Sequence, residues 1–274
     1  MENGDWVTGN ITLRINGEPV AMEMTVPAFP VKPHRMLPVL QQMSNAVVDS
    51  CVRAVEAEGK EISCKAGCGA CCRQAVPISE IEAYQIAELV EAMPEPRRAE
   101  IKKRFADALA RFTEIDWFDG LVDLKDMASA GDPDFSPEKF ERVINDYIRE
   151  DVPCPFLEDE SCSIHPDRPL VCREYMVTSP AENCISPTDE SIEKVPIFMR
   201  PSKAILRLGR TKNMDGISSL MLVEALDFTS RNAEIFEEKD GQTWARDFFD
   251  ALTKKTVLDD EPTPPRKRRK KRWN

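Results

Sequence analysis

Nine cysteines are the residues of this chain best suited to chemistry, since its 274 residues include only two histidines. Eight of the cysteines lie in two windows, residues 64–72 and 154–184. Thiolates at short spacing can converge on one metal ion or cluster, because a turn of two or three residues brings their sulfur atoms together. The predicted metal ligands are Cys64, Cys68, Cys71, Cys72, Cys154, Cys162, Cys172 and Cys184.

The sequence favours metal binding over disulfide formation. Residues 1–5 are acidic and lack an apolar stretch, which argues against a secretory signal. Without export, disulfides are a poor default, and a cysteine-rich chain is expected to bind metal or to do redox chemistry. The longest aliphatic runs span only a few residues, so no transmembrane segment is predicted and we expect a cytoplasmic protein.

The spacing of the cysteines bears on the choice of metal. Structural zinc usually takes two paired knuckles of the Cys-x₂₋₄-Cys kind. The first window supplies such pairs, whereas the gaps in the second are seven, nine and eleven residues long. Widely spaced single ligands suit a larger iron–sulfur cluster better. We therefore predict an iron–sulfur cluster of the [4Fe–4S] type, with zinc as the alternative.

Residues beside the cysteines could support a thiolate centre. Gly67 and Gly69 permit tight turns in which backbone N–H groups point at sulfur. Metal–thiolate sites of either type carry net negative charge, which neighbouring cations could offset. The cations next to the predicted ligands are Lys65, Arg73, Arg168 and Arg173.

Two features of the windows leave alternatives open. Cys71 and Cys72 are adjacent, and adjacent side chains project in different directions in any regular backbone. We therefore expect them not to serve one mononuclear site, so that the thiols form either two four-thiolate sites or one cluster with spare thiols. His165, three residues after Cys162, is either a further ligand or a turn residue beside Pro166.

The predicted fold is mainly α-helical, with a small N-terminal β-hairpin and a loop-rich cysteine core. Alternating residues flank Asn16-Gly17, a strong hairpin signal, over residues 6–26. Eight prolines between residues 151 and 201 exclude a long helix there. Helices are expected at 35–58, after a capping box at Ser79, at 97–112, at 115–130, after the N-cap Ser136, around 221–228 and around 245–252.

Cys51 and His34 stand apart from the two windows. Cys51 shares one face of the first predicted helix with Leu40, Met43 and Val47, so we interpret it as a small core hydrophobe. His34 lies in a proline-rich linker, and the sequence predicts no role for it. The expected domains are a hairpin and linker (1–34), a cysteine-cluster domain (35–200), a helical extension (201–257) and a disordered basic tail (258–274).

The charge of the chain is unevenly distributed. Its net charge is −11, yet residues 266–272 carry seven consecutive positive charges, which leaves −11 − 7 = −18 on the rest. The acidic body excludes a general attraction to nucleic acid. The basic tail could contact nucleic acid or an anionic surface, and the acidic body could contact a protein partner.

The combined motifs resemble a known family. They are Cys64-x₃-Cys68-x₂-Cys71-Cys72, then Cys-Pro-Phe-Leu from Cys154, Cys-x-Ile-His from Cys162 and Arg-Pro-x-x-Cys-Arg ending at Arg173. This set, over about residues 64–175, resembles the bacterial cysteine-cluster (CxxCxxCC) proteins with a zinc- or iron-chelating domain, a family that includes the flagellin N-methylases. The first gap is one residue longer than in the commonest form, a departure that concerns Cys64. The resemblance implies zinc or iron binding.

Three hypotheses of function follow, and whether the protein is an enzyme stays open. The first is an iron–sulfur protein with a redox role. The second is a protein lysine N-methyltransferase that uses S-adenosylmethionine and is related to flagellin N-methylase. The third is a structural zinc module that mediates protein or nucleic-acid interactions. The spacing Cys64-x₃-Cys68-x₂-Cys71 also occurs in radical S-adenosylmethionine enzymes, but the alternating β/α pattern of their barrel is absent from the sequence.

Overall fold

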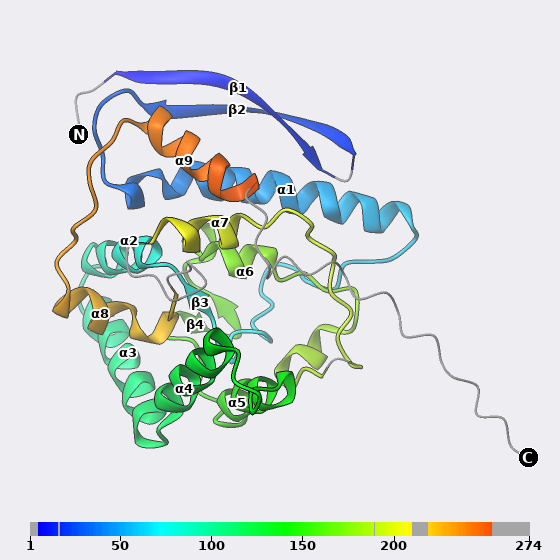
Figure 1. Cartoon of the computed structure of the whole chain (residues 1–274), viewed down its shortest axis with the longest axis vertical. Helices are drawn as coiled ribbons and strands as arrows, with labels where there is room; N and C mark the ends of the chain where they lie inside the picture. Colours follow the sequence, from blue (N-terminus) through cyan, green and yellow to red (C-terminus); the bar gives the residue numbers. More distant parts are fainter. Residues whose placement is uncertain (1–4, 16, 189, 210–218, 254–274) are drawn as a thin grey trace, which may run out of the picture.

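Helices surround a loop-rich centre, and a β-hairpin covers one side (Figure 1). The computed structural model describes residues 5–253 apart from 16, 189 and 210–218. The longer elements are β1 (Trp6–Ile15), β2 (Glu18–Pro27), α1 (Leu37–Ala57), α2 (Glu80–Glu91), α3 (Arg97–Glu114), α4 (Trp117–Ala130), α5 (Pro137–Arg149), α7 (Pro201–Leu208) and α9 (Gly241–Thr253). The shorter ones are η1 (Pro33–Met36), β3 (Pro77–Ile78), β4 (Leu157–Glu158), β5 (Ser161–Cys162), η2 (His165–Asp167), α6 (Leu170–Glu174), η3 (Ala181–Ile185), β6 (Leu220–Met221), η4 (Leu222–Glu224) and α8 (Ala225–Arg231).

The mainly α-helical fold with a small N-terminal hairpin is confirmed. Strands β1 and β2 pair antiparallel, from Trp6 opposite Pro27 to Ile15 opposite Glu18. Gly17 at the turn has φ +84°, a conformation that favours glycine, whereas Asn16 lies outside the described residues. Helices α1 and α9 pack against β2, so the hairpin covers the helices with one face and leaves the other exposed.

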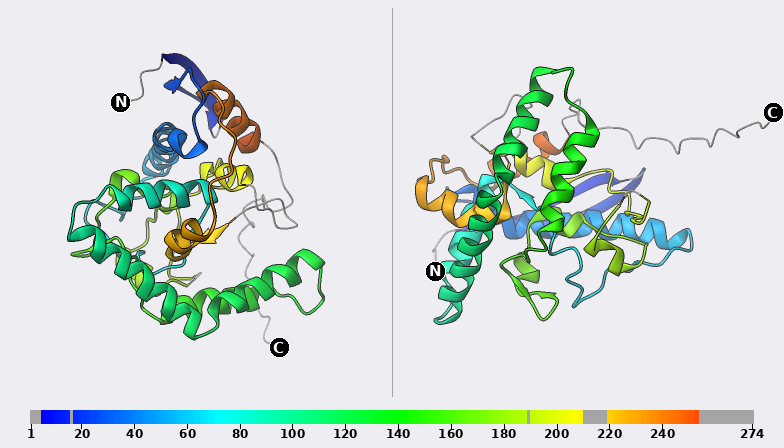
Figure 2. Two further views of the ribbon diagram at one scale, coloured as in Figure 1. Left: turned by 90° about the vertical axis from the view of Figure 1, so that its left-hand side faces the viewer. Right: turned by 90° about the horizontal axis from the view of Figure 1, so that it is seen from below.

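Local capping signals set two of the helix starts. The Ser79 hydroxyl accepts the backbone N–H of Glu82, and the Glu82 carboxylate accepts the backbone N–H of Ser79, so the predicted capping box begins α2. Ser136 accepts the N–H of Lys139 in the same way at the start of α5. Helices α3, α4 and α5 then run along the side of the molecule opposite the hairpin (Figure 2).

The C-terminal elements pack into the same cores as the elements before them. One buried cluster joins Val26 of β2, Met43 of α1, Leu170 of α6, Ile205 of α7 and Phe248 of α9. The short helices α6 and α7, within and at the end of the predicted loop region 151–201, were not predicted. The many prolines there interrupt the periodic pattern from which helices are predicted. The basic tail lies outside the described residues.

A short antiparallel pairing between β3 and β6 links segments about 140 residues apart, with Pro77 opposite Met221. The N–H of Leu222 also donates to the carbonyl of Val76 at 2.8 Å. This contact was not predicted, because two-residue strands leave no periodic signal. The pairing places Leu222 beside Val76, shortly after the first cysteine window.

No helix in the described part of the chain is both long enough and apolar enough to span a membrane.

Candidate functional site

One cavity of about 100 Å³ collects all eight predicted thiols. Residues of both cysteine windows, far apart in sequence, line it together. Its remaining lining is largely apolar and includes Val76, Phe156, Ile164 and Leu222. Cys51 instead lies in α1, 1% exposed, in a core with Val47 and Ile197. The structure therefore separates eight thiols around one space from a ninth in the core.

Tight turns shape the first window. The N–H of Cys68 donates to the carbonyl of Lys65 at 3.1 Å, and the N–H of Cys72 donates to that of Gly69 at 2.9 Å. Gly67 has φ +83°, which favours glycine. Because these turns curl the chain, Cys64, Cys68, Cys71 and Cys72 all reach the same cavity.

Direct contacts hold the second window against the first. The N–H of Cys154 donates to the carbonyl of Cys72 at 2.7 Å. The Arg73 guanidinium donates to both carboxylate oxygens of Glu160, at 2.8 and 3.0 Å. Gly69 lies so close that an added Cβ would be 2.5 Å from the carbonyl oxygen of Glu160. Only a residue without a side chain fits this contact.

Buried polar groups position the segment that carries Cys172. The capping carboxylate Glu82 also accepts the N–H of Leu170, at 2.9 Å, and so fixes the start of α6. Buried Arg173 donates to the carbonyl of Arg168 at 3.0 Å and to Asn45 of α1 at 3.0 Å. Residues of α1 and α2 thus both form hydrogen bonds with α6, the short helix that contains Cys172.

Two further ligand candidates, Cys64 and Cys184, are held by hydrogen bonds to distant residues. The N–H of Val177 donates to Sγ of Cys64 at 3.4 Å. Gln74 donates its Nε2 to the carbonyl of Cys184 at 2.8 Å. Cys184 is 3% exposed, within η3. Of the predicted ligands it lies furthest along the chain, and the structure brings it to the cavity with the rest.

Burial keeps most of these thiols protonated in the metal-free protein. Loss of solvent is the main cause that raises the pKa of Cys154 to about 12 and that of Cys184 to about 11. It also raises the pKa of Cys64, Cys162 and Cys172. A metal that binds here must therefore displace protons from neutral thiols.

The charges of neighbouring thiolates also raise the pKa values of several of these thiols. After desolvation, the charges of Cys154, Cys71 and Cys162 raise the pKa of Cys172. The charges of Cys162 and Cys71 likewise raise that of Cys154, and the charge of Cys71 raises that of Cys162. Each of these four thiols thus interacts with the other three.

Cys71 also interacts with the other thiols. Its charge raises the pKa of Cys64 and of Cys184, and its own pKa is raised first by a hydrogen bond with Cys72 and then by burial. The expectation that Cys71 and Cys72 point apart holds for regular backbone only. Here the turn at residues 69–74 replaces regular backbone, and both side chains line one cavity.

Only some of the predicted cations face the cavity. Lys65 and Arg168 line it, whereas Arg73 and Arg173 brace the loops around it. The Arg168 Nε is buried and has no hydrogen-bond partner among the described residues. The positive charge of Arg168 lowers the pKa of Cys64, Cys71 and Cys162 against the effect of burial. An anionic group in the cavity would lie close to this positive charge.

His165 also lines the cavity and lies 2.7 Å, through Nε2, from a guanidinium nitrogen of Arg168. Burial and the charges of Arg168 and Arg173 lower its pKa, so the neutral imidazole is favoured. In this form Nε2 can accept a hydrogen bond from the Arg168 guanidinium. This contact occupies Nε2 and orients the guanidinium.

The pKa values predict how the stability of the metal-free protein depends on pH. The unfolded chain loses thiol protons near pH 8.5, whereas folded Cys184 and Cys154 keep theirs to about pH 11 and 12. Between these values the folded state binds more protons, so the free energy of unfolding falls as pH rises, by about 1.4 kcal/mol per pH unit for each buried thiol. Urea unfolding of chelator-treated protein from pH 8 to 10 measures this slope. In the metal-loaded protein a ligating thiol such as Cys154 holds no proton, so its share of the slope should be lost, and equal slopes would contradict the assignment of that thiol as a ligand.

Within the described residues, no three His, Cys, Asp or Glu side chains are placed to hold a single metal ion. The thiols instead surround the cavity at its walls.

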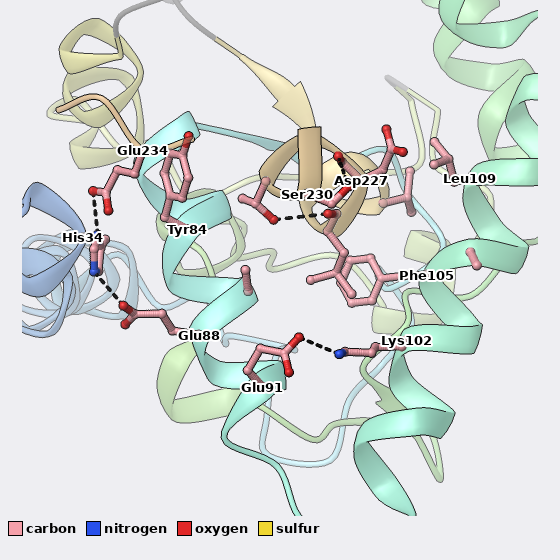
Figure 3. A pocket seen from close by; sticks show the side chains of 15 residues that line it. His34, Tyr84, Glu88, Glu91, Lys102, Phe105, Leu109, Asp227, Ser230 and Glu234 are labelled. Atoms are coloured by element: carbon pink, nitrogen blue, oxygen red, sulfur yellow. Dashed lines mark hydrogen bonds and ion pairs between the residues drawn. The ribbon is translucent and has the colours of Figure 1, made fainter. Parts of the chain in front are cut away.

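A larger cavity of about 690 Å³ lies between α2, α3 and α8 (Figure 3). There His34, which the sequence left without a role, is 5% exposed. Its Nδ1 lies 2.9 Å from Glu234 and its Nε2 3.0 Å from Glu88, so it joins α2 to the segment before α9. Glu91 pairs with Lys102 at 2.5 Å. These acids already have partners, and no described cysteine lines the space.

Comparison with known proteins supports the assignment of the cysteine cavity. Residues 63–195 match the family CxxCxxCC, described as "Putative zinc- or iron-chelating domain". The match extends beyond the quoted motifs and includes Cys184. No curated protein and no solved structure is significantly similar to the chain. Over residues 63–195 the chain is therefore similar to the zinc- or iron-chelating domains of the CxxCxxCC family.

Proposed function

We propose that the cysteine cavity binds one iron–sulfur cluster of the [4Fe–4S] type and that the protein transfers electrons through it. The observation that carries this proposal is the convergence of all eight thiols on one cavity of about 100 Å³. A closed structural zinc site surrounds its ion with four sulfur atoms at about 2.3 Å and leaves no such space. A single water needs only about 10–15 Å³ by the same measure. The room available supports a group of several atoms.

The proposed ligands are Cys71, Cys154, Cys162 and Cys172. Each of these thiols interacts electrostatically with the other three, which supports their closeness in space. They come from both windows, so the cluster would link the turn at residues 69–74 to β5 and α6. The other thiols would form the rest of the wall: Cys64, Cys68, Cys72 and Cys184.

The residues present fit an anionic cluster. Arg168 offers a positive charge and a buried N–H that has no partner in the described part of the chain. Val76, Phe156 and Leu222 add apolar lining beside the thiols, and the access of water and hydrogen bonds to sulfur set a cluster's reduction potential. When bound, such a cluster supplies one-electron redox chemistry. The chain's own part is to hold the thiolates, exclude water and offset the charge.

Anaerobic preparation of the full chain tests this proposal. We expect a brown protein with broad visible absorption that contains about four iron atoms and acid-labile sulfide per chain. A colourless protein with stoichiometric zinc would instead support the structural zinc module and contradict the cluster. Equilibrium binding of S-adenosylmethionine to the loaded protein then distinguishes an electron carrier, which does not bind it, from a methyltransferase.

Arg168→Met is expected to lower the reduction potential of the cluster. Reduction adds negative charge, and the variant removes the cation that stabilises it. A loss of about 1.4 kcal/mol in the reduced state corresponds to a fall of roughly 60 mV for one electron. Redox titration followed by visible absorption measures the shift. Arg168→Lys, which keeps the charge, should restore part of the potential, and an unchanged potential in Arg168→Met would contradict this role.

A further inference from the structure

The outer edge of β1 carries backbone groups that are free to pair. The N–H of Ala28 donates to the carbonyl of Asp5 at 2.8 Å. This bond shows which residues of β1 form hydrogen-bonded pairs with β2. Because hydrogen-bonded and non-hydrogen-bonded pairs alternate, the odd residues of β1 bond to β2 and the even ones point their N–H and C=O groups outward. The outward set is Trp6, Thr8, Asn10, Thr12 and Arg14.

These five residues are exposed, and their outward backbone groups form no hydrogen bond with the rest of the described chain. The odd residues Val7, Ile11 and Leu13 are partly buried on the other face. Figure 1 shows β1 on the outside of the hairpin, with the helices on the side of β2. The edge is therefore ten residues long and open to a partner.

The two edges of the hairpin differ in how they are protected. On β2 the outward positions include Pro19 and Pro27, which have no N–H, and the charged Glu23. Proline and charge are the usual devices that prevent unwanted strand pairing. β1 has no proline, and its one charged residue is Arg14. Of the two hairpin edges in the described structure, that of β1 is thus the one suited to an additional strand.

We propose that a second copy of this chain pairs with this edge, β1 against β1, antiparallel about a two-fold axis at Asn10. The two hairpins would then form one four-stranded sheet. In this register each outward residue meets another outward residue, so all five exchange backbone hydrogen bonds. A two-fold axis closes the contact and leaves no further free β1 edge.

The side chains of β1 are complementary to themselves in this register. Arg14 lies opposite Trp6 of the second copy, an arrangement that permits a cation–π contact. Trp6 is 57% exposed, and its ring contacts that of Phe29 edge to face, with 6.2 Å between the ring centroids. Thr8 lies opposite Thr12, and Val7 opposite Leu13. No like charges face each other, a requirement for a stable strand pair.

Charge substitution at the axis tests the proposal on the full, metal-loaded chain. We expect the natural protein to sediment as a dimer at about 100 μM, a concentration suited to a weak contact. Asn10→Lys and Asn10→Glu each place two like charges opposite one another, so each variant alone should be monomeric. An equimolar mixture should again dimerise. Recovery in the mixture also shows that both variants are folded.

Thr12→Pro provides a second test, because proline removes one outward N–H without a partner in the hairpin. It should abolish the dimer, whereas Thr12→Ala, which keeps the N–H, should not. A monomeric natural protein would overturn the proposal. So would a dimer that persists in Asn10→Lys and Thr12→Pro, or a mixture of the Asn10 variants that stays monomeric.

Discussion

Serine in place of both Cys71 and Cys172 is expected to leave the protein without its metal and less stable by about 4–5 kcal/mol, the loop-closure value for a cross-link across roughly one hundred residues. Cys71 interacts with thiols from both windows, and Cys172 interacts with three others. The harder serine oxygen is a weaker ligand for soft metal centres. Metal analysis after desalting and urea unfolding measure the two losses on the same samples.

Two controls make this result specific to the site. Cys51→Ala removes a buried thiol of α1 that lies in the core and outside the cavity, so it should keep its full metal content. The natural protein after metal removal should match the double variant in stability within about 1 kcal/mol, since both lack the same cross-link. Full metal retention in the double variant would disprove the ligand assignment.

Gly69→Ala is expected to destabilise the protein by about 1–3 kcal/mol, the usual cost of overpacking, and to lower its metal content. The added Cβ would be 2.5 Å from both the carbonyl oxygen of Glu160 and Cδ1 of Leu157. The backbone carbonyl cannot rotate away, so the first window must move off the β4–β5 hairpin. Because that movement separates Cys71 from Cys162, stability and metal retention should fall together.

Gly120→Ala serves as the matched control for this substitution. Gly120 lies in α4, where an added Cβ would meet nothing within 4 Å. Alanine in a helix is favoured over glycine by roughly 0.5–1 kcal/mol, so this variant should be as stable as the natural protein or more so. Natural stability and metal content in Gly69→Ala would show that the close approach of the two windows is not required.

Local elements could be predicted because their causes are local. The alternation on either side of the hairpin turn, the capping box at Ser79 and the N-cap at Ser136 each act within a few residues. The burial of Cys51 followed from the spacing of Leu40, Met43 and Val47 on one helical face, and all are buried. Periodicity and capping need no knowledge of distant contacts.

The sequence also identified the eight thiols, but it could not predict how their side chains are arranged around the cavity. Between residues 151 and 201 prolines remove the periodicity from which side-chain directions are predicted. The direction of Cys71 and Cys72 depends on the turn that follows Gly69, and that turn is held by contacts with Glu160 and Cys154. Such contacts join residues more than eighty positions apart.

By itself, therefore, the sequence determined the hairpin, the long helices and the set of thiols that could bind zinc or iron. Tertiary structure decided which cations line the cavity with those thiols: Arg168 and Arg73 look alike beside their cysteines in sequence, but of these two only Arg168 lines it. It also brought Leu222 to the cavity through the β3–β6 pairing and enclosed His34 between two glutamates. The physical reason is that burial and charge act through space, whereas the sequence reports only what is close along the chain.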